Sequence, residues 1–259
     1  MLFSSLVFLW IFLPLVLILY RLLPGRGKNA LLLVASLFFY AWGEPVYILL
    51  MLASITLNYL GSLLLDGREG AARKLCLALV VAVNLALLGY YKYYSFAGDT
   101  LAALLGRQVL PVRDIALPLG ISFYTFQAMS YVIDLYRRRI GVQKSWFLLA
   151  LYISFFPQLV AGPIVRYTTV EAEITRREES LSEFAQGTVR FLFGLGKKML
   201  LANAMGEVAD GVFAQDPGAM AASLAWVGAA AYTLQIYFDF SAYSDMAIGL
   251  GRMFGFHFL

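Results

Sequence analysis

The chain has 259 residues, of which 61% are hydrophobic and only 14% are charged. Soluble domains are nearer half apolar and a quarter charged, so one core of this size cannot bury all these apolar side chains. The net charge is +4, and the basic residues lie between apolar runs without forming a stripe, which argues against nucleic acid as a partner. We therefore expect an all-α, polytopic membrane protein embedded in a lipid bilayer.

The first apolar run, from about Leu2 to Leu23, predicts a retained transmembrane helix. It is about 20 residues long, enough to cross a hydrocarbon core of roughly 30 Å. No basic segment precedes it and no small-residue cleavage site follows it, so it does not resemble a signal peptide. Arg21, Arg26 and Lys28 come next and favour a cytoplasmic loop. The N-terminus is therefore expected outside.

Four further apolar segments are expected at residues 30–42, 46–65, 75–91 and 115–136. The basic loops after the second and fourth of these fall on the side predicted to be cytoplasmic. The third ends in the aromatic cluster "GYYKYYSF", for which we expect a belt at the membrane interface, with an aromatic ligand lining as the alternative. The single cysteine, Cys76, excludes an internal disulfide.

The stretch "FFPQLVAGPIVRY", Phe155 to Tyr167, breaks the next apolar run. Residues 146–156 are too few for a full span, and Pro157 and Pro163 follow closely. Arginines in the charged stretch 166–183 favour the cytoplasmic side on both flanks. A re-entrant element fits better than a span, and such broken backbone is tolerated at membrane depth only where protein buries it or water reaches it.

The segment 184–205, "FAQGTVRFLFGLGKKMLLANAM", predicts a tilted or interfacial helix. Its two adjacent lysines, Lys197 and Lys198, are expected to extend to the lipid headgroups. A last apolar region, 220–238, continues into "DFSAYSDMAIGLGRMFGFHFL".

Polar residues in this last segment are the strongest site candidates, because ionisable groups within a membrane often mark function. On a helix, Gln235, Asp239 and Tyr243 would share one face. Tyr237, Ser241 and Asp245 would share a second face, and Ser244 adds a further hydroxyl. The pattern predicts either the polar wall of a cavity or hydrogen bonds between packed helices.

Other polar residues receive structural interpretations. Asp134 precedes three arginines and predicts a salt bridge, while Asn58 and Asn84 predict packing hydrogen bonds. Arg166 would anchor the bend at the interface or meet an anionic donor. His257, the single histidine, has no carboxylate near it in sequence and is not assigned a catalytic role. No metal-binding or nucleotide-binding motif is found.

Four phrases together resemble the membrane-bound O-acyltransferase family, in its alginate O-acetyltransferase-like branch. They are "LLLVASLFFYAWGEPVYILLMLASITLNY", "LPLGISFYTFQAMSYVIDLYR", "FFPQLVAGPIVRY" and "YTLQIYFDFSAYSDMAIGLGRMFGF". They occur in the family's order and spacing and span nearly the whole chain. The pair of lysines in "GLGKKMLLAN" also fits this branch.

The resemblance implies one membrane-embedded domain over residues 1–259, with short, broken or re-entrant helices around a central funnel. Members pass an acyl group from a cytoplasmic donor to a hydroxyl acceptor. In this branch the group is acetyl, with acetyl-CoA as a donor substrate and no bound cofactor. The acceptor is an exopolysaccharide such as alginate, reached through periplasmic partner proteins from the bacterial inner membrane. Gln158, Arg166 and the "QIYFDFSAYSD" helix would line the path.

The family's catalytic histidine lies beyond the "YFDFSAYSDMA" phrase, after a segment rich in tryptophan and arginine. Here it is expected beyond Leu259, and His257 does not match its motif. The resemblance therefore implies that this stretch is inactive alone.

Two alternatives stay open at this point. One is a relative that transfers D-alanyl groups to teichoic acid. The other is a transporter or lipid-handling scaffold without enzymatic activity, because broken helices and buried carboxylates also mark transport sites.

Overall fold

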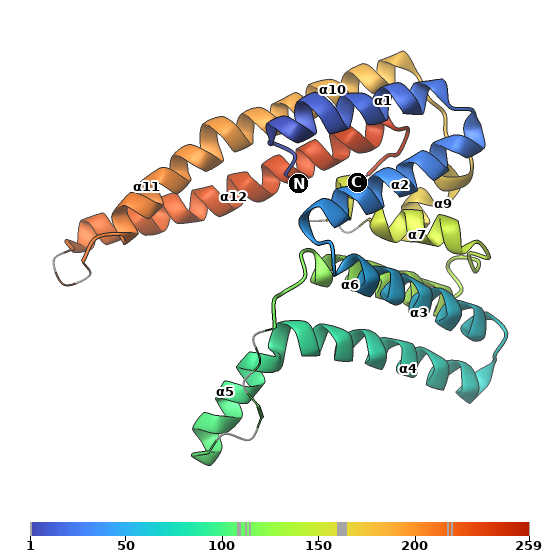
Figure 1. Ribbon diagram of the computed structural model, residues 1–259, viewed down its shortest axis with the longest axis horizontal. Helices are drawn as coiled ribbons and strands as arrows, with labels where there is room; N and C mark the ends of the chain where they lie inside the picture. The colour runs from blue at the N-terminus through green and yellow to red at the C-terminus, as the bar shows by residue number, and fades with distance from the viewer. Residues whose placement is uncertain are drawn as a thin grey trace. The chain divides into compact units, whose positions relative to one another are not determined.

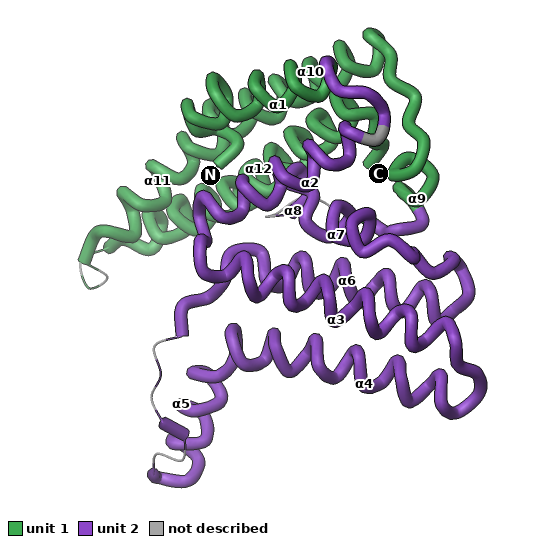
Figure 2. The backbone as a smooth tube through the Cα atoms, turned by 45° about the vertical axis from the view of Figure 1, so that its right-hand side comes forward, with its two compact units in different colours: residues 1–21, 161–165, 169–259 green, residues 22–160, 166–168 purple. Residues whose placement is uncertain are grey.

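The regular structure in the computed structural model is helical throughout the residues that it describes, 2–107, 110–111, 113, 115–159, 165–216, 218 and 220–258 (Figure 1). This agrees with the all-α prediction. The chain divides into two compact units (Figure 2). Unit 1 comprises Met1–Arg21, Ala161–Val165 and Thr169–Leu259, and unit 2 comprises Leu22–Val160 and Arg166–Thr168.

Unit 2 is built around three helices that lie side by side, α3, α4 and α6, with α7 packed on α2 (Figures 1 and 2). Its elements are α2 (Gly25–Gly43), α3 (Ile48–Asp66), α4 (Gly70–Leu88), η2 (Gly89–Tyr93), α5 (Tyr94–Leu105), α6 (Ile121–Tyr136), α7 (Trp146–Ser154) and α8 (Phe156–Leu159). The second predicted segment, 30–42, is thus the later part of a longer helix whose N-cap is Pro24.

Buried polar groups fix α3 against its neighbours. The amide nitrogen of Asn58 donates to the Asn84 side-chain oxygen at 3.0 Å. The amide nitrogen of Asn84 donates in turn to the Asn58 side-chain oxygen, also at 3.0 Å. Both side chains are fully buried, so each satisfies the other in an apolar surrounding. The prediction of packing hydrogen bonds is confirmed. Arg73 at the start of α4 donates to the carbonyl of Leu135 at 2.9 Å, near the end of α6.

Two predicted boundaries in unit 2 are wrong. The helix that begins at Gly70 does not end at the aromatic cluster but continues through η2 and α5 to Leu105. No proline interrupts it before Pro111, and Gly89 keeps helical φ and ψ. The fifth predicted segment starts as a helix at Ile121, not at residue 115. Pro118 and a left-handed Gly120 (φ 71°) precede that start.

The short apolar element after residue 145 is a nine-residue helix, α7, followed by the single turn α8. Ser145 caps α7 by accepting a hydrogen bond from the Leu148 N–H at 3.4 Å. The element is thus too short to span a bilayer, as its sequence predicts. The predicted re-entrant bend lies largely at residues 160–164, outside the described residues.

Unit 1 is organised along one long helix, α12 (Ala222–Met253). A second, unbroken helical stretch runs beside it, formed by α10 (Leu181–Gly196), the π-helix η3 (Lys197–Ala202) and α11 (Asn203–Phe213) (Figure 1). The remaining elements are η1 (Phe8–Phe12), α1 (Leu13–Leu22) and α9 (Tyr167–Thr175). The apolar region predicted at 220–238 is therefore the first half of a longer helix.

Small residues allow this stretch to approach α12 at backbone distance. A Cβ atom at Gly249 would lie 2.6 Å from the Gly187 carbonyl oxygen and 2.6 Å from the Phe191 backbone nitrogen. One at Gly194 would lie 2.7 Å from the Ala242 carbonyl oxygen. Such contacts leave no room for a side chain, and they are a typical packing mode of membrane helices.

The spacing of buried small residues explains the π-helix. On α12, Gly228, Ala242 and Gly249 are buried and are separated by multiples of seven residues. The facing stretch buries Gly187, Gly194, Ala202 and Ala209, so one of its steps is eight residues long. That longer step contains η3, whose wider turn accommodates the additional residue.

The N-terminal apolar helix is Phe8–Leu22, which is shorter than the predicted span of residues 2–23. Ser5 lies at its start, where the hydroxyl accepts from the Phe8 N–H at 3.3 Å and donates to the Leu2 carbonyl. At the other end, the Tyr20 hydroxyl is bonded to the Phe254 carbonyl at 2.8 Å and to Glu179 at 2.8 Å.

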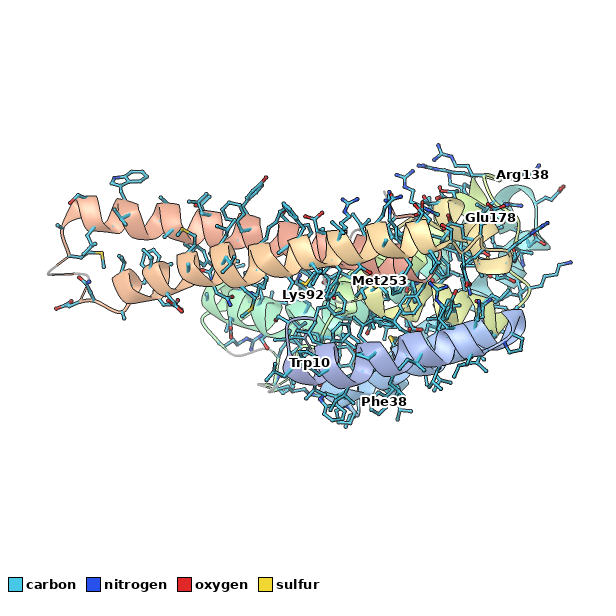
Figure 3. All side chains as sticks on the ribbon, turned by 90° about the horizontal axis from the view of Figure 1, so that it is seen from above. Trp10, Phe38, Lys92, Arg138, Glu178 and Met253 are labelled. Atoms are coloured by element: carbon cyan, nitrogen blue, oxygen red, sulfur yellow. The ribbon has the colours of Figure 1, made fainter. Side chains whose placement is uncertain are left out.

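Within the part of the chain that the structure describes, two helices are long and apolar enough to cross a membrane, Ile48–Asp66 and the continuous helix Gly70–Leu105. Many large apolar side chains in both units are solvent-exposed, among them Trp10 (76%) and Phe38 (50%), which are labelled in Figure 3. Large apolar side chains exposed in this number are typical of surfaces that contact lipid or another protein. Composition and structure together support a membrane location.

Candidate functional site

The main polar group of unit 1 lies between α10, η3 and α12. Asp245 accepts hydrogen bonds from Arg190 Nε at 3.1 Å and from Lys197 Nζ at 2.5 Å. Lys197 also donates to the Ser241 hydroxyl at 3.1 Å, and Lys198 Nζ lies 2.8 Å from Asp239 Oδ1. We call these six residues, Arg190, Lys197, Lys198, Asp239, Ser241 and Asp245, the charge cluster.

Helix geometry places the members of the charge cluster. Arg190 and Lys197 are seven residues apart, as are Gly187 and Gly194, so the cations lie beside the line of closest helix contact. Ser241 and Asp245 are one turn apart on α12, and both bind Lys197. The prediction that these two residues share a face is confirmed.

The other predicted residues of α12 meet different neighbours. Gln235 packs at Gly206, where a Cβ atom would lie 2.9 Å from its amide nitrogen. The Tyr243 ring stacks on Phe3 at 4.6 Å. Tyr237 is 64% exposed, and Ser244 is partly buried. The two predicted rows therefore do not form one polar wall in unit 1.

Lys197 and Lys198, which the sequence predicts to extend to the lipid headgroups, also have partners within unit 1, and their contact with headgroups stays a prediction. Both ammonium groups are paired with carboxylates of α12, and their side chains are only 27% and 26% exposed. The reason is tertiary: α12 brings Asp239 and Asp245 within reach, and pairing is favoured over leaving charges unmatched in apolar surroundings. Arg190, Lys197 and Lys198 are the site residues that the sequence-based list missed.

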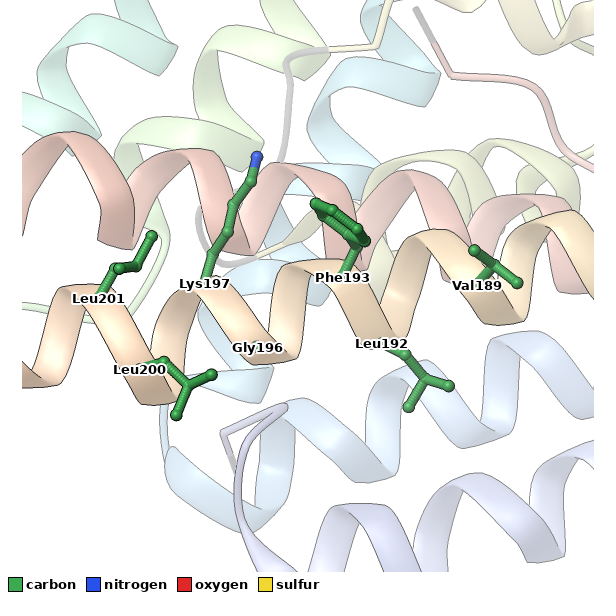
Figure 4. Close-up of a pocket in the computed structure, with 7 residues that line it drawn as sticks. All are labelled: Val189, Leu192, Phe193, Gly196, Lys197, Leu200 and Leu201. Carbon is green, nitrogen blue, oxygen red and sulfur yellow. The ribbon is translucent and has the colours of Figure 1, made fainter.

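An apolar hollow of about 500 Å³ adjoins the charge cluster. Figure 4 shows the residues that line it, which all come from α10 and η3: Val189, Leu192, Phe193, Gly196, Lys197, Leu200 and Leu201. Apart from Lys197 the lining has no charged side chain. The five large apolar residues are between 41% and 74% exposed, so the hollow is shallow and open.

A second polar group holds the segment that follows α12. His257 Nδ1 lies 2.7 Å from Glu173 Oε1, its Nε2 lies 3.2 Å from Glu183 Oε2, and its backbone N–H donates to Glu173 Oε2 at 2.9 Å. The hydrogen bond to Glu173 and the charges of both carboxylates raise the pKa of His257. The sequence indicated no carboxylate partner, because Glu173 and Glu183 are far away along the chain. Both ring nitrogens contact carboxylates, so His257 acts as a clamp that holds the segment after α12 to α9 and α10.

Unit 1 should be most stabilised by this clamp under mildly acidic conditions. A histidine whose folded pKa exceeds its ordinary value near 6.5 contributes its full stabilisation below that value and loses it as pH rises through the folded pKa. We expect the difference in thermal midpoint between the parent protein and His257→Gln to be largest near pH 6 and to shrink above it. Melting curves in detergent between pH 5.5 and 9 would measure this. A difference that grows with pH would contradict it.

The candidates of unit 2 are less closely associated with other charged groups. Gln158 is buried, and its amide nitrogen donates to the Tyr152 carbonyl at 2.7 Å, an oxygen that also accepts from Gln127 at 2.8 Å. Among the described residues, the Gln158 side-chain oxygen has no hydrogen-bond partner. Arg166 is exposed. Asp134 pairs with Arg139 at 3.6 Å, which confirms the predicted salt bridge.

Comparison with known proteins gives a consistent result along the whole sequence, although no family model matches the chain. The chain is 43% identical to a probable alginate O-acetylase of Azotobacter vinelandii, over 100% of this chain and 52% of that protein. It is 33% identical to a peptidoglycan O-acetyltransferase of Helicobacter pylori, over 98% of this chain and 54% of that protein.

A more distant match is a teichoic acid D-alanyltransferase of Streptococcus thermophilus, 27% identical over 53% of this chain and 34% of that protein. The chain spans about half the length of the curated O-acetylating relatives that it matches. The similarity to them is high, extends over the whole chain and agrees with the four sequence phrases. The chain belongs to the membrane-bound O-acyltransferase family, in the branch of the alginate O-acetylases.

Proposed function

We propose that the protein serves in membrane-bound O-acetylation, passing acetyl groups across the membrane to an exopolysaccharide such as alginate. The observation that carries this proposal is the 43% identity to a probable alginate O-acetylase over the full chain. The 33% identity to a peptidoglycan O-acetyltransferase supports the same reaction type on another polymer. Transfer of an acetyl group to a sugar hydroxyl needs a base and a route for the acyl group.

The proposed location is the bacterial inner membrane, with several spans, the N-terminus outside and both units belonging to one membrane-embedded domain. Support comes from the 61% apolar composition, the two helices long enough to span and the exposed apolar side chains. Acetyl-CoA is the proposed donor substrate, with periplasmic acetyl-transfer proteins as partners on the outer side. No residue of this chain is assigned as the catalytic base.

The proposed path residues divide between the two units. Gln158 offers a buried side-chain oxygen that no other described residue contacts by a hydrogen bond, which suits a hydrogen bond from a substrate N–H or O–H. In unit 1 the polar residues of α12, together with Lys197, place hydroxyl and charged groups in apolar surroundings. Their proposed part is to hold and orient substrates along the funnel.

The deciding experiment compares exopolysaccharide from cells with and without the intact gene. Alkaline release of acetate, quantified per sugar residue, should fall to background in the deletion strain and return on complementation. Unchanged acetate would disprove the proposal. Measuring ester-linked alanine on the cell envelope in the same strains distinguishes the D-alanyl alternative. If the protein is instead a transporter or lipid scaffold, isolated membranes supplied with donor and acceptor should form the same amount of each ester whether or not they contain it.

The proposed orientation predicts opposite accessibilities for the two ends of α3. In a Cys76→Ala background, Val46→Cys is expected to react with a membrane-impermeant maleimide added to right-side-out vesicles, and Glu69→Cys is expected to react only after permeabilisation. Both positions are exposed, with side chains 72% and 89% accessible respectively, so burial would not hide them. The reverse pattern would place the N-terminus inside and contradict the prediction from the basic loops.

A further inference from the structure

The charge cluster carries one positive charge more than its carboxylates neutralise. Among the ion pairs of the described residues, Arg190, Lys197 and Lys198 meet two carboxylates, those of Asp239 and Asp245. Among the described hydrogen bonds Arg190 donates through Nε alone, whereas a guanidinium has five N–H donors in a planar fork. Its side chain is 41% exposed, so the remaining donors can be reached from outside. The cluster is therefore suited to receive one further anion.

The surface next to this excess charge is apolar. Lys197 belongs both to the charge cluster and to the lining of the hollow, whose other large side chains are aliphatic or aromatic (Figure 4). On one side of the same helical stretch a ligand would meet ammonium and guanidinium groups, and on the other leucine, valine and phenylalanine. A ligand that satisfies both has an anionic head and a hydrocarbon chain.

We infer that α10 and η3 bind one anionic phospholipid, with its phosphate at Arg190 and Lys197 and an acyl chain along the hollow. Arginine forks bind phosphate oxygens in pairs, so the donors of Arg190 other than Nε suit a phosphate. A zwitterionic lipid would bring its own cation to the site and leave the excess charge unmatched. A free phosphate would leave the exposed apolar lining uncovered. The inference rests on the proposed membrane location, but not on the proposed acetyl transfer.

The length of the helix permits this placement. The unbroken stretch from Leu181 to Phe213 rises roughly 50 Å at 1.5 Å per residue, which exceeds a hydrocarbon core of roughly 30 Å. Part of it must therefore lie at headgroup depth or run obliquely. The charge cluster lies close to the middle of this stretch, so an oblique or interfacial helix is required for phosphate contact. This agrees with its predicted tilted or interfacial character.

The test titrates the purified full chain in a neutral detergent with phosphatidylglycerol or phosphatidylcholine, and follows bound lipid by native mass spectrometry and the shift in thermal midpoint. Phosphatidylglycerol should bind more tightly than phosphatidylcholine. Arg190→Gln should weaken it about fivefold, the effect of removing one cation from an anionic headgroup. Arg190→Lys should keep most of the preference. The matched control Arg176→Gln, an exposed arginine of unit 1 outside the cluster, should change nothing.

Each other outcome overturns the inference in a distinct way. Equal binding of both lipids would leave only an apolar surface, and an equal shift from glycerol phosphate alone would identify a soluble phosphate as the ligand. Reconstitution into vesicles of either lipid tests the location separately, and a protein that enters neither kind of vesicle would refute the proposed membrane location. Should Arg190→Gln not fold, photoactivatable phosphatidylglycerol can be cross-linked to the parent protein. Labelled peptides should come from residues 181–202, and labelling confined to other segments would overturn the inference.

Discussion

Replacing Gly249 with leucine should abolish the folding of unit 1. A side chain at this position would meet the Gly187 carbonyl oxygen and the Phe191 backbone nitrogen, both at 2.6 Å from its first carbon. These are backbone atoms of α10, so neither can turn aside as a side chain could. Overpacking of this kind typically costs about 1–3 kcal/mol even when neighbours can adjust. Here α10 and α12 would have to separate, and we expect no monodisperse protein by size-exclusion chromatography in detergent.

The matched control is Gly211→Leu in α11. Nothing lies within 4 Å of the carbon that this substitution adds, and the residue is exposed, so the yield of folded protein should stay near that of the parent. Gly249→Ala gives an intermediate test, because its single methyl group already overlaps the same backbone atoms. If Gly249→Leu gave normal yield and melting behaviour, the close packing of α10 on α12 would be refuted.

Replacing Asp245 with leucine should have the second-largest effect. Asp245 is the shared partner of Arg190 and Lys197, and its loss would leave two partly buried cations beside each other. Removing one partner of a fully buried ion pair costs about 3–5 kcal/mol. The side chains here are 19% to 41% exposed, and solvent reduces that figure to about 2–3 kcal/mol. A drop in the thermal midpoint in detergent would show this.

The interpretation of that result depends on two further variants. Asp210→Leu changes an exposed carboxylate of α11 and should leave the midpoint nearly unchanged. The triple change Asp245→Leu, Arg190→Met and Lys197→Met removes Asp245 together with both of its cations and should recover most of the loss, because the remaining pair of Lys198 and Asp239 is neutral as a whole. Failure of the triple variant to recover would mean that packing at Asp245, and not charge, explains the loss.

The sequence predicts the helices of this protein better than their ends. Apolar runs locate α3, α6 and α12. A long apolar segment in a membrane must satisfy its own backbone hydrogen bonds, and a helix does so. The predicted segment 75–91 ends before its helix does, for an identifiable reason. The tyrosines after Gly89 are typical of an interface, yet they are compatible with a helix, and no proline or left-handed glycine stops it before Gly106 (φ 65°). Local composition cannot distinguish a membrane boundary from a helix boundary.

The candidate site shows the same limit at the level of side chains. Helical spacing places Ser241 and Asp245 on one face, because that is a property of α12 alone. Their partners lie on another helix, and Asp245 is 55 residues from Arg190 and 48 from Lys197 in sequence. Nothing in the spacing of one segment indicates which residue of another will face it. His257 and its two glutamates were missed for the same reason.

The reciprocal amide pair of Asn58 and Asn84 has a consequence for how unit 2 can move. The surfaces of α3 and α4 are otherwise mostly apolar and could slide past one another with little loss of contact. Translation by one turn, about 5.4 Å, would separate the two amides and leave their polar atoms in an apolar interface. The pair thus acts as a register lock, of the kind that a single buried asparagine provides in coiled coils. Any motion of these helices should therefore carry α3 and α4 together as one rigid body.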